Sequence, residues 1–364
     1  MNYTIPSLPL SIEIETKTVL KKVAKAHQAL AELKGCVATI PNESILISTL
    51  SLQEAKDSSA IENIVTTHDD LYQSDTFASQ FASMAAKEVH NYANALRNGF
   101  QQVKQTGLLT NNHILQIQAG IETNNAGFRK LPGTALKNDR TGEVVYTPPQ
   151  HPDELLRLMN NLEAFINDDT LCDWDDLVKM AVIHHQFESI HPFYDGNGRT
   201  GRIINILYLV KQGLLQLPIL YLSRYINQYK GEYYRLLQKV RTEDAWEDWI
   251  MFMLDGVEKT SRQSIVLLQK IREIMSSHKQ QIRSQLPKIY SQDLLNNLFR
   301  HPYTKIDFVM DELDVSRTTA TKYLDDLAKI QLLQKRKLGK HNYYINIELF
   351  NMLSNAHRIF ENIG

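Results

Sequence analysis

Glycine and proline are scarce in this chain of 364 residues, which contains 15 Gly and 11 Pro. Together they make up about 7% of the chain, against roughly 12% in an average protein. Because both residues interrupt regular structure, their scarcity favours long helices. Cysteine is scarcer still, since Cys36 and Cys172 are the only two, and this excludes a disulfide framework.

The chain also lacks long apolar runs and an excess of either charge. The longest apolar stretches, such as residues 203–210, are far below the ~18–20 residues of a membrane span. The N-terminus has neither the basic region nor the apolar core of a signal peptide, so we expect a soluble cytoplasmic protein. With 40 Lys and Arg against 41 Asp and Glu, the net charge of −1 excludes a uniformly basic polyanion binder.

Apolar residues recur with helical spacing through most of the first 280 residues. The pattern predicts helices over residues 16–34, 42–56, 77–106, 108–123, 152–166, 173–189 (with Asp173 as N-cap) and 197–213, and it stays helical to about residue 279. Between Gly127 and Pro149 the pattern changes to Gly, Pro and short β-branched runs. This change predicts a β-hairpin inserted in a helical protein.

After Pro287 the sequence predicts a separate module. Helical patterns over 291–300, 307–313 and 316–329 precede a basic turn and the alternating residues 342–346. The tight turn before Ser316 matches a helix-turn-helix, and the last segment matches its wing. Residues 281–364 carry a net charge of +3, against −4 for residues 1–280.

The residues that carry chemistry are concentrated between His191 and Arg202, in the segment HPFYDGNGRTGR. Pro192 ends the preceding helix, and Gly196 and Gly198 allow close backbone approach before a new helix begins. Backbone N–H groups at a helix N-terminus bind anions. The segment therefore predicts a phosphate site.

Four side chains complete this predicted site. Arg199 and Arg202, three residues apart on the first helical turn, direct two guanidinium groups at the same place. Asp195 supplies an oxygen ligand suited to Mg²⁺ on phosphates, and His191 can accept a proton near neutral pH. Together they describe transfer to or from a nucleotide phosphate.

A metal hydrolase that uses His184, His185, His191 and Asp195 is an alternative. Adjacent histidines lie about 100° apart on a helix, so both rings do not easily face one ion. No Glu-bearing zinc motif accompanies them. The phosphate site is therefore the stronger hypothesis.

The segment resembles the signature of the Fic (Fic/Doc) family, His-Pro-Phe-x-Asp-Gly-Asn-Gly-Arg-x-x-Arg, at every defined position. Phe187, Glu188 and Ile190 upstream also fit the family pattern. The resemblance implies a helical Fic fold that transfers AMP from ATP to a Ser, Thr or Tyr hydroxyl of a protein, itself included, and releases pyrophosphate.

The resemblance also implies a role for each residue of the motif. His191 deprotonates the target hydroxyl, and Asp195 holds Mg²⁺ on the α- and β-phosphates. The residues expected to bind the nucleotide are Asp195, Gly196, Asn197, Gly198, Arg199, Thr200, Gly201 and Arg202, with Gly196 to Gly198 as the anion hole and the arginines on the outer phosphates. Tyr233 and Tyr234 resemble the family segment beside adenine and ribose, and packing between core helices is an equal alternative for them.

Two further segments extend the resemblance. Ser58, Glu62 and Asn63 fit the inhibitory pattern [Ser/Thr]-x-x-x-Glu-[Gly/Asn], which implies an inhibitory helix at about 57–66. Glu62 would pair with Arg202 and prevent productive binding of the γ-phosphate. The hairpin at 127–149 takes the place of the family's flap, which would hold the target by strand addition.

We therefore expect a mainly α protein in four parts: an N-terminal helical region (1–106), a Fic core (107–260), a helical linker (261–284) and a winged helix-turn-helix domain (285–364). The expected function is an autoinhibited, Mg²⁺-dependent protein adenylyltransferase, as a monomer or homodimer. Two alternatives stay open. The same site would remove AMP from a modified protein, or the winged helix would bind DNA or a protein while the core senses nucleotide. The DNA contacts would be Arg317, Lys322, Lys335, Arg336, Lys337 and Lys340.

Overall fold

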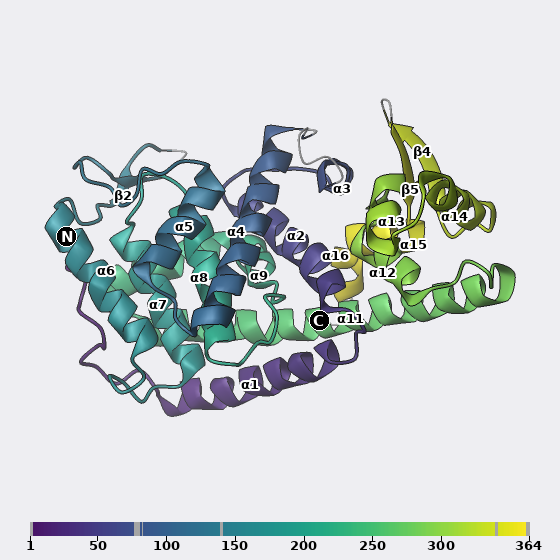
Figure 1. The fold of residues 1–364 in the computed structure, drawn as a ribbon. Coiled ribbons are helices and arrows are strands. Elements are labelled where there is room, and N and C mark those ends of the chain that lie inside the picture. Colours follow the sequence, from purple (N-terminus) through teal and green to yellow (C-terminus); the bar gives the residue numbers. More distant parts are fainter. Residues whose placement is uncertain (1–2, 76–80, 82, 139–140, 339–340, 362–364) are drawn as a thin grey trace. The chain divides into compact units, whose positions relative to one another are not determined.

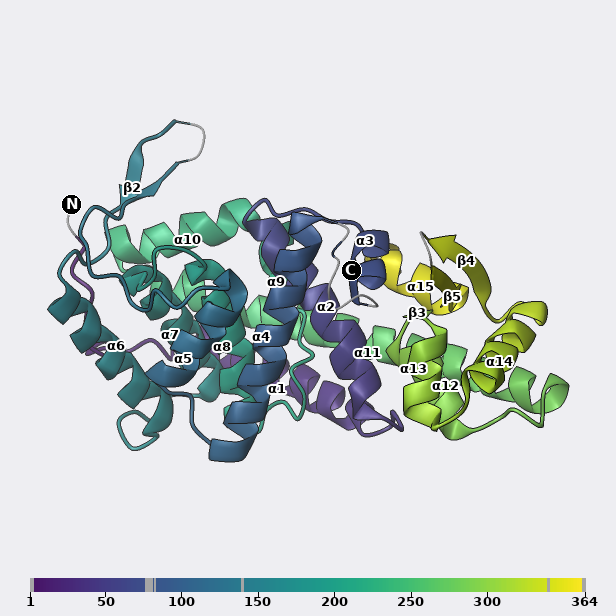
Figure 2. The ribbon, with the colours of Figure 1, turned by 45° about the horizontal axis from the view of Figure 1, so that its top comes forward.

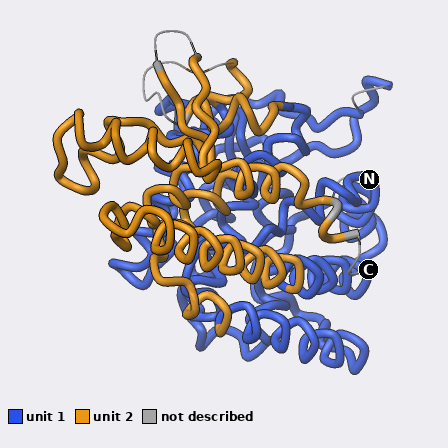
Figure 3. The backbone as a smooth tube through the Cα atoms, turned by 90° about the vertical axis from the view of Figure 1, so that its right-hand side faces the viewer, with its two compact units in different colours: residues 1–34, 53–65, 88–261 blue, residues 35–52, 66–87, 262–364 orange. Residues whose placement is uncertain are grey.

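The computed structural model describes residues 3–75, 81, 83–138, 141–338 and 341–361. Figure 1 shows a predominantly helical protein, which confirms the predicted mainly α fold. The chain forms two compact units, coloured in Figure 3. Unit 1 contains residues 1–34, 53–65 and 88–261, and unit 2 contains residues 35–52, 66–87 and 262–364. Of the helices in the described part of the chain, none has the length and apolar character needed to cross a membrane.

Unit 1 is built around two buried helices, α7 (Asp176–Ile190) and α8 (Asn197–Lys211), that run side by side in Figure 1. It also contains α5 (Asn111–Glu122), α6 (Pro152–Asn167), α9 (Leu222–Gln228) and α10 (Lys230–Glu243). Every residue of α7 from Leu177 to Ile190 is buried, because α6 and α8 both pack against it. This packing fixes the end of α7 and the start of α8, where the motif lies.

Four helices contribute residues to both units. They are α1 (Lys17–Val37), α2 (Glu43–Ile61), α4 (Met84–Thr106) and α11 (Trp246–Gln285). In α2 the residues from Gln53 onward belong to unit 1, and these carry the predicted inhibitory motif.

The predicted β-hairpin is present in unit 1. Strands β1 (Leu136–Lys137) and β2 (Val144–Tyr146) pair antiparallel, with residues 139 and 140 of the connection outside the described part. In Figure 2, β2 stands away from the helices of this unit. Tyr146 anchors its base, because the ring is buried and the hydroxyl donates to the Ser189 carbonyl at 2.9 Å.

Unit 2 contains the predicted order of three helices followed by a β-hairpin. Its elements are α3 (His68–Asp75), α12 (Gln292–Arg300), β3 (Tyr303–Thr304), α13 (Ile306–Leu313), α14 (Arg317–Lys329), β4 (Gln334–Leu338), β5 (His341–Ile345), α15 (Ile347–Ser354) and α16 (Ala356–Glu361). The strands form an antiparallel sheet in the order β3, β5, β4. As predicted, Ser316 caps α14, since its Oγ accepts from the Thr319 N–H at 3.3 Å.

Three helix limits differ from the sequence prediction. Helix α4 begins at Met84 rather than Phe77, and residues 76–80 and 82 lie outside the described part. Asp175 rather than Asp173 caps α7, because its Oδ1 accepts from the Leu177 N–H at 2.9 Å.

The third difference concerns the predicted inhibitory helix at about 57–66. Helix α2 runs from Glu43 to Ile61, past the predicted end at residue 56, so Ser58 lies in its last turn. Glu62 and Asn63 follow in a turn closed by hydrogen bonds to Ser59 and Ala60, and Asn63 has a positive φ of 65°. The helix therefore ends before Glu62, and the turn sets the position of that side chain.

Candidate active site

The motif forms the loop between α7 and α8 and the first turn of α8. Gly196 precedes the helix with a φ of 78°, a conformation that favours glycine. Asn197 holds the loop in place, because its side chain accepts from the Phe193 N–H at 2.8 Å and donates to the Phe193 carbonyl at 2.9 Å. A Cβ on Gly198 would lie 2.5 Å from Glu62 Oε1, so a larger residue there would displace the Glu62 carboxylate. The N-terminus of α8 thus faces Glu62.

His191 ends α7 in the left-handed conformation, with a φ of 48°. Its backbone N–H donates to the Phe187 carbonyl at 2.9 Å. Burial, followed by the nearby positive charges of Arg129 and Arg241, lowers the pKa of His191 to about 3. The imidazole is therefore neutral at pH 7, and the same burial makes it a weaker proton acceptor than an exposed histidine.

Arg129 binds the root of the hairpin to the catalytic loop. Its Nε donates to the His191 carbonyl at 2.8 Å and its Nη2 to the Ile190 carbonyl at 3.3 Å, and Nη2 also donates to the Pro149 carbonyl. Its backbone N–H donates to the Pro192 carbonyl at 2.9 Å. No local pattern in the sequence indicates this role, because the carbonyls that Arg129 binds are distant from it in the chain.

Tyr194 makes a second connection between the loop and the hairpin root. Its hydroxyl accepts from the backbone N–H groups of Lys130 and Leu131 at 3.0 and 3.1 Å. These hydrogen bonds lower the pKa of Tyr194. Arg129 and Tyr194 together tie the hairpin root to the segment that carries His191 and Asp195.

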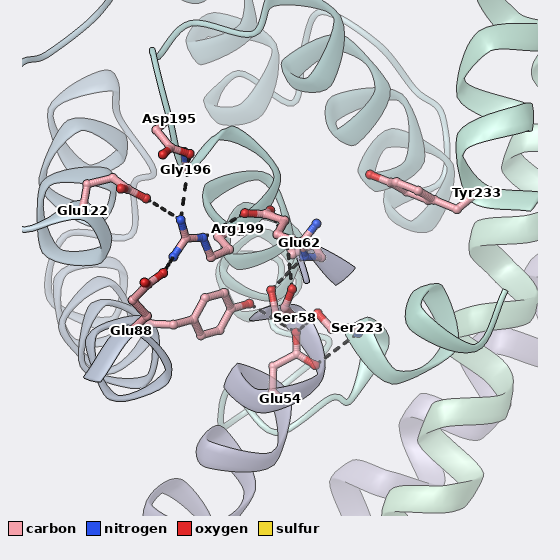
Figure 4. Close-up of polar contacts among 12 residues, drawn as sticks. Glu54, Ser58, Glu62, Glu88, Glu122, Asp195, Gly196, Arg199, Ser223 and Tyr233 are labelled. Carbon is pink, nitrogen blue, oxygen red and sulfur yellow. Dashed lines mark hydrogen bonds and ion pairs between the residues drawn. The ribbon is translucent and has the colours of Figure 1, made fainter. Parts of the chain in front are cut away.

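Four carboxylates surround the Arg199 guanidinium in Figure 4: three accept hydrogen bonds from it, and Asp195 lies 4.0 Å away. Its Nε donates to Glu62 at 2.9 Å, its Nη1 to Glu88 at 3.1 Å and its Nη2 to Glu122 at 2.7 Å. The Arg199 side chain is only 4% exposed. Glu88 and Glu122 come from α4 and α5, and no local motif in the sequence marks them.

Arg202 is bound by the predicted inhibitory segment. Its Nε donates to Ser58 Oγ at 2.7 Å, and its Nη2 donates to the Ser58 carbonyl at 3.0 Å and to Glu62 Oε1 at 2.6 Å. Burial disfavours the charge of Arg202, but Glu62 together with Tyr233, Tyr92 and Glu188 outweighs burial, and the pKa of Arg202 is raised. The predicted pair of Glu62 and Arg202 is present, and Glu62 also bridges to Arg199. Asn63 accepts from Lys230 Nζ at 3.1 Å.

Asp195 is the exposed carboxylate of the motif, with 76% of its side chain accessible. Its Oδ1 accepts from the Gly196 N–H at 2.7 Å and lies 4.0 Å from Arg199 Nη2. Among the described residues, no group of three or more His, Cys, Asp or Glu side chains is arranged to hold a metal ion. A single open carboxylate nevertheless fits Mg²⁺, which takes one or two carboxylates and completes its shell with phosphates and water.

His184 and His185 are core residues in this structure. His184 Nε2 lies 2.8 Å from the Tyr233 hydroxyl and its Nδ1 lies 3.0 Å from Asn205 Nδ2. Burial lowers the pKa of His184 to about 3. His185 Nε2 lies 3.2 Å from the Leu237 carbonyl. These contacts give the two rings different partners and do not support the alternative of a shared metal ion.

The remaining predicted nucleotide-binding residues differ in how far they are exposed to solvent. Tyr233 is 1% exposed, so of its two predicted roles the structure supports packing. Tyr234 is 48% exposed and stays open to a ligand. Thr200 is buried, and a Cβ on Gly201 would lie 2.7 Å from Glu188 Oε1. Gly201 therefore allows the close approach of α8 to α7.

Three family models match the chain. The model described as "Fic/DOC family N-terminal" matches residues 20–101, and "Fic/DOC family" matches residues 108–209. The model described as "Protein adenylyltransferase SoFic-like, C-terminal domain" matches residues 274–349. Together these matches cover most of the chain.

Curated relatives named "Protein adenylyltransferase Fic" match a shorter region. Those of Drosophila erecta and Aedes aegypti are 30% and 31% identical over 112 residues, which is 31% of this chain. The matched region covers 21% of each relative, so the chain spans about one fifth of their length.

Solved structures support the fold over a longer region. A Fic family protein from Desulfovibrio desulfuricans G20 is 18% identical with a TM-score of 0.59, covering 93% of this chain and 97% of its own. A Fic domain containing signaling protein from Bacteroides thetaiotaomicron is 18% identical with a TM-score of 0.53, covering 67% and 97%.

Proposed function

The chain belongs to the Fic/DOC family, and from this premise we propose that it is a protein adenylyltransferase restrained by its own Glu62. The reaction would transfer AMP from ATP to a Ser, Thr or Tyr hydroxyl of a target protein or of the chain itself. The observation that carries the proposal is the α8 N-terminus, where two buried arginines and an open carboxylate lie on the segment that begins at a neutral histidine.

The chemistry needs a base and stabilisation of negative charge. His191 would accept the proton of the target hydroxyl as its oxygen bonds to the α-phosphorus, and the bond to pyrophosphate breaks. The N–H groups at the start of α8 and the Arg202 guanidinium would bind the phosphates. Mg²⁺ bound through Asp195 would neutralise part of the phosphate charge.

The hairpin is the proposed binding place for the target segment. Val144 and Val145 in β2 are exposed, although Tyr146 beside them is buried. A short strand with exposed apolar side chains can accept an extended peptide by β-augmentation. Arg129 and Tyr194 would keep this strand in register with His191.

Glu62 would restrain the reaction because its carboxylate occupies the place of phosphate. It binds both arginines at 2.9 and 2.6 Å, so its negative charge competes with the triphosphate. ATP would then bind without the orientation that attack on the α-phosphorus requires.

Labelled ATP tests the proposal. With label on the α-phosphate, we expect Glu62→Gly to incorporate label into protein at least about tenfold faster than wild type, because a charge-assisted hydrogen bond contributes roughly 1.5–3 kcal/mol. Label on the γ-phosphate should not be incorporated. His191→Ala in the Glu62→Gly background should abolish the signal. Glu13→Gly, at an exposed glutamate outside the site, is the matched control and should equal wild type. Incorporation from the γ-phosphate would refute the proposal.

Removal of AMP from a modified protein is a second candidate. Glu62 lies at the phosphate site and remains 23% exposed, so its carboxylate can reach a water molecule. Here Glu62→Gly would abolish release of AMP from an adenylylated target, whereas it would accelerate the forward transfer. Following both reactions with one variant separates the two candidates.

A further inference from the structure

Glu54 is a buried carboxyl that the proposed chemistry does not use. It lies on α2 and is 1% exposed. It accepts three hydrogen bonds: from the Ser223 N–H at 3.1 Å, from the Ser223 hydroxyl, and from the Tyr92 hydroxyl at 3.2 Å. Burial of a carboxylate is costly unless such donors are present. Ser223 is on α9 and Tyr92 is on α4, so Glu54 joins three helices of unit 1.

Glu54 lies on the same face of the chain as the inhibitory residues. Glu54, Ser58 and Glu62 follow one another at intervals of four, which places successive side chains about one helical turn apart. Figure 4 shows this row from Glu54, beside Ser223, to Glu62, beside Arg199. The hydroxyl of Tyr92 also interacts with Ser58, which links the two ends of the row.

We propose that Glu54 is a positioning residue of the inhibitory turn: its bonds to Ser223 and Tyr92 fix the end of α2 so that Ser58 and Glu62 bind Arg202. The inference rests on the proposed function, since it presupposes that Glu62 restrains AMP transfer. The hydrogen bonds of Glu54 go to Ser223 and Tyr92 and not to Arg202, so Glu54 acts on the inhibitory residues through the position of α2.

The geometry of the turn explains why such a residue is needed. Helix α2 ends at Ile61, and the Glu62 N–H closes the turn by donating to the Ser59 carbonyl at 3.0 Å. Glu62 therefore follows any rotation or sliding of the last turns of α2. A hydrogen bond to a glutamate of 2.6 Å, as between Glu62 and Arg202, is lost by a small displacement. The three bonds to Glu54 oppose that displacement about two turns before Glu62.

The charges around Glu54 are consistent with this role. Burial raises the pKa of Glu54 to about 7, Ser223 opposes the rise through its hydrogen bonds, and Asp57 and Arg202 act on it with opposite signs. The positive charge of Arg202, which Glu62 binds, therefore also lowers the pKa of Glu54. Loss of Glu62 and loss of Glu54 should therefore act on the same equilibrium, between the inhibitory turn bound to Arg202 and the turn released from it.

The test uses the full chain and compares Glu54→Gln, Ser223→Ala, Glu62→Gly and the double variant Glu54→Gln with Glu62→Gly. The readout is the initial rate of incorporation from ATP labelled on the α-phosphate. We expect each of the first two variants to incorporate label about fivefold to tenfold faster than wild type, because each loses one or two buried hydrogen bonds. The double variant should be no faster than Glu62→Gly.

Ser261→Ala is the matched control, since Ser261 Oγ is buried without a hydrogen-bond partner in unit 1, and it should equal wild type. Thermal unfolding checks that each variant folds, and Ser223→Ala carries the test if Glu54→Gln does not fold. A merely structural role would lower the rate in both backgrounds. If Glu62→Gly incorporates label fast but Glu54→Gln and Ser223→Ala are no faster than wild type, the inference about Glu54 is overturned and the proposed function is not. A Glu62→Gly variant that incorporates no label would overturn the proposed function as well.

Discussion

Glu188 illustrates how burial changes a single residue at the back of the site. Its side chain is 8% exposed, and its Oε1 has no hydrogen-bond partner among the described residues. Burial raises the pKa of Glu188 to about 7, although the positive charge of Arg202 opposes the rise. Between its ordinary pKa of 4.5 and about 7, the folded protein therefore holds a proton that the unfolded chain has released.

This proton makes stability depend on pH with a definite sign. Because the folded state binds more protons, Glu188 should reduce the free energy of unfolding as pH rises from about 4.5 to 7. Glu188→Gln removes this titration. We expect the difference in free energy of unfolding between this variant and wild type to shift by about 2–3 kcal/mol in favour of the variant from pH 5 to pH 8. Urea unfolding at both pH values measures the difference, and parallel pH profiles would contradict the assignment.

Single residues also show which part of the site a sequence can predict. His191 to Arg202 are contiguous, so the sequence predicted them as one motif, whereas the pairing of Glu62 with Arg202 was implied by the family resemblance. Glu88 and Glu122 could not be predicted, because they reach Arg199 from two other helices. Tyr233, by contrast, was named as a possible nucleotide contact and is buried in the structure. A sequence does not distinguish a buried aromatic ring from one that faces a ligand.

Among the elements, the hairpin and the catalytic loop act as one piece because Arg129 bonds to both. The guanidinium reaches the carbonyls of Ile190 and His191, and that of Pro149 at the end of the hairpin segment. A lysine amine cannot reproduce this planar arrangement of donors. Loss of Arg129 would leave buried carbonyls without donors and the hairpin root untied.

Arg129→Gln and Arg129→Lys should both reduce AMP transfer at least about tenfold in the Glu62→Gly background, since one misplaced ångström can cost that much or more. Thermal unfolding should shift down by a few degrees for a loss of about 1–2 kcal/mol. Lys130→Gln, at the neighbouring exposed residue, is the control and should leave both measurements unchanged. Full activity of Arg129→Lys would show that charge alone suffices.

Element boundaries were predicted less well than the elements themselves, for local reasons. Asp173 and Asp175 are both good caps, and only the bond to the Leu177 N–H selects Asp175. Strand β3 has two residues and no alternating pattern of its own, so only its pairing with β5 defines it. The end of α2 at Ile61 depends on a turn in which Asn63 has positive φ. Asparagine tolerates this conformation but adopts others as well, so its presence alone does not predict the turn.

At the scale of the whole molecule, the near-zero net charge conceals a C-terminal part with a net charge of +3, in which three of the predicted DNA contacts lie beside acidic side chains. Arg317 bonds to Asp307 at 2.9 Å and Lys335 to Asp325 at 2.7 Å, and Arg336 lies 3.9 Å from Asp69. Of the other predicted DNA contacts, Lys340 lies outside the described residues. Acidic partners on the same face would repel a DNA backbone. We therefore favour a protein partner for the proposed winged helix.

Fluorescence anisotropy with a random-sequence duplex tests this preference. We expect no binding by the full chain at physiological salt, and little dependence on salt below it, because few phosphates would be neutralised. Asp325→Asn, which frees Lys335, should increase binding at low salt. Tight binding by the wild type with a steep salt dependence would favour the DNA-binding alternative instead.

The most direct test of the central claim is the intact mass of the purified chain after incubation with ATP and Mg²⁺, for wild type, Glu62→Gly and Glu62→Gly with His191→Ala. The account predicts a mass increase of one or more AMP groups for Glu62→Gly, little for wild type and none for the variant without His191. Equal modification of wild type and Glu62→Gly would contradict the restraint by Glu62. Modification that persists without His191 would contradict the proposed chemistry.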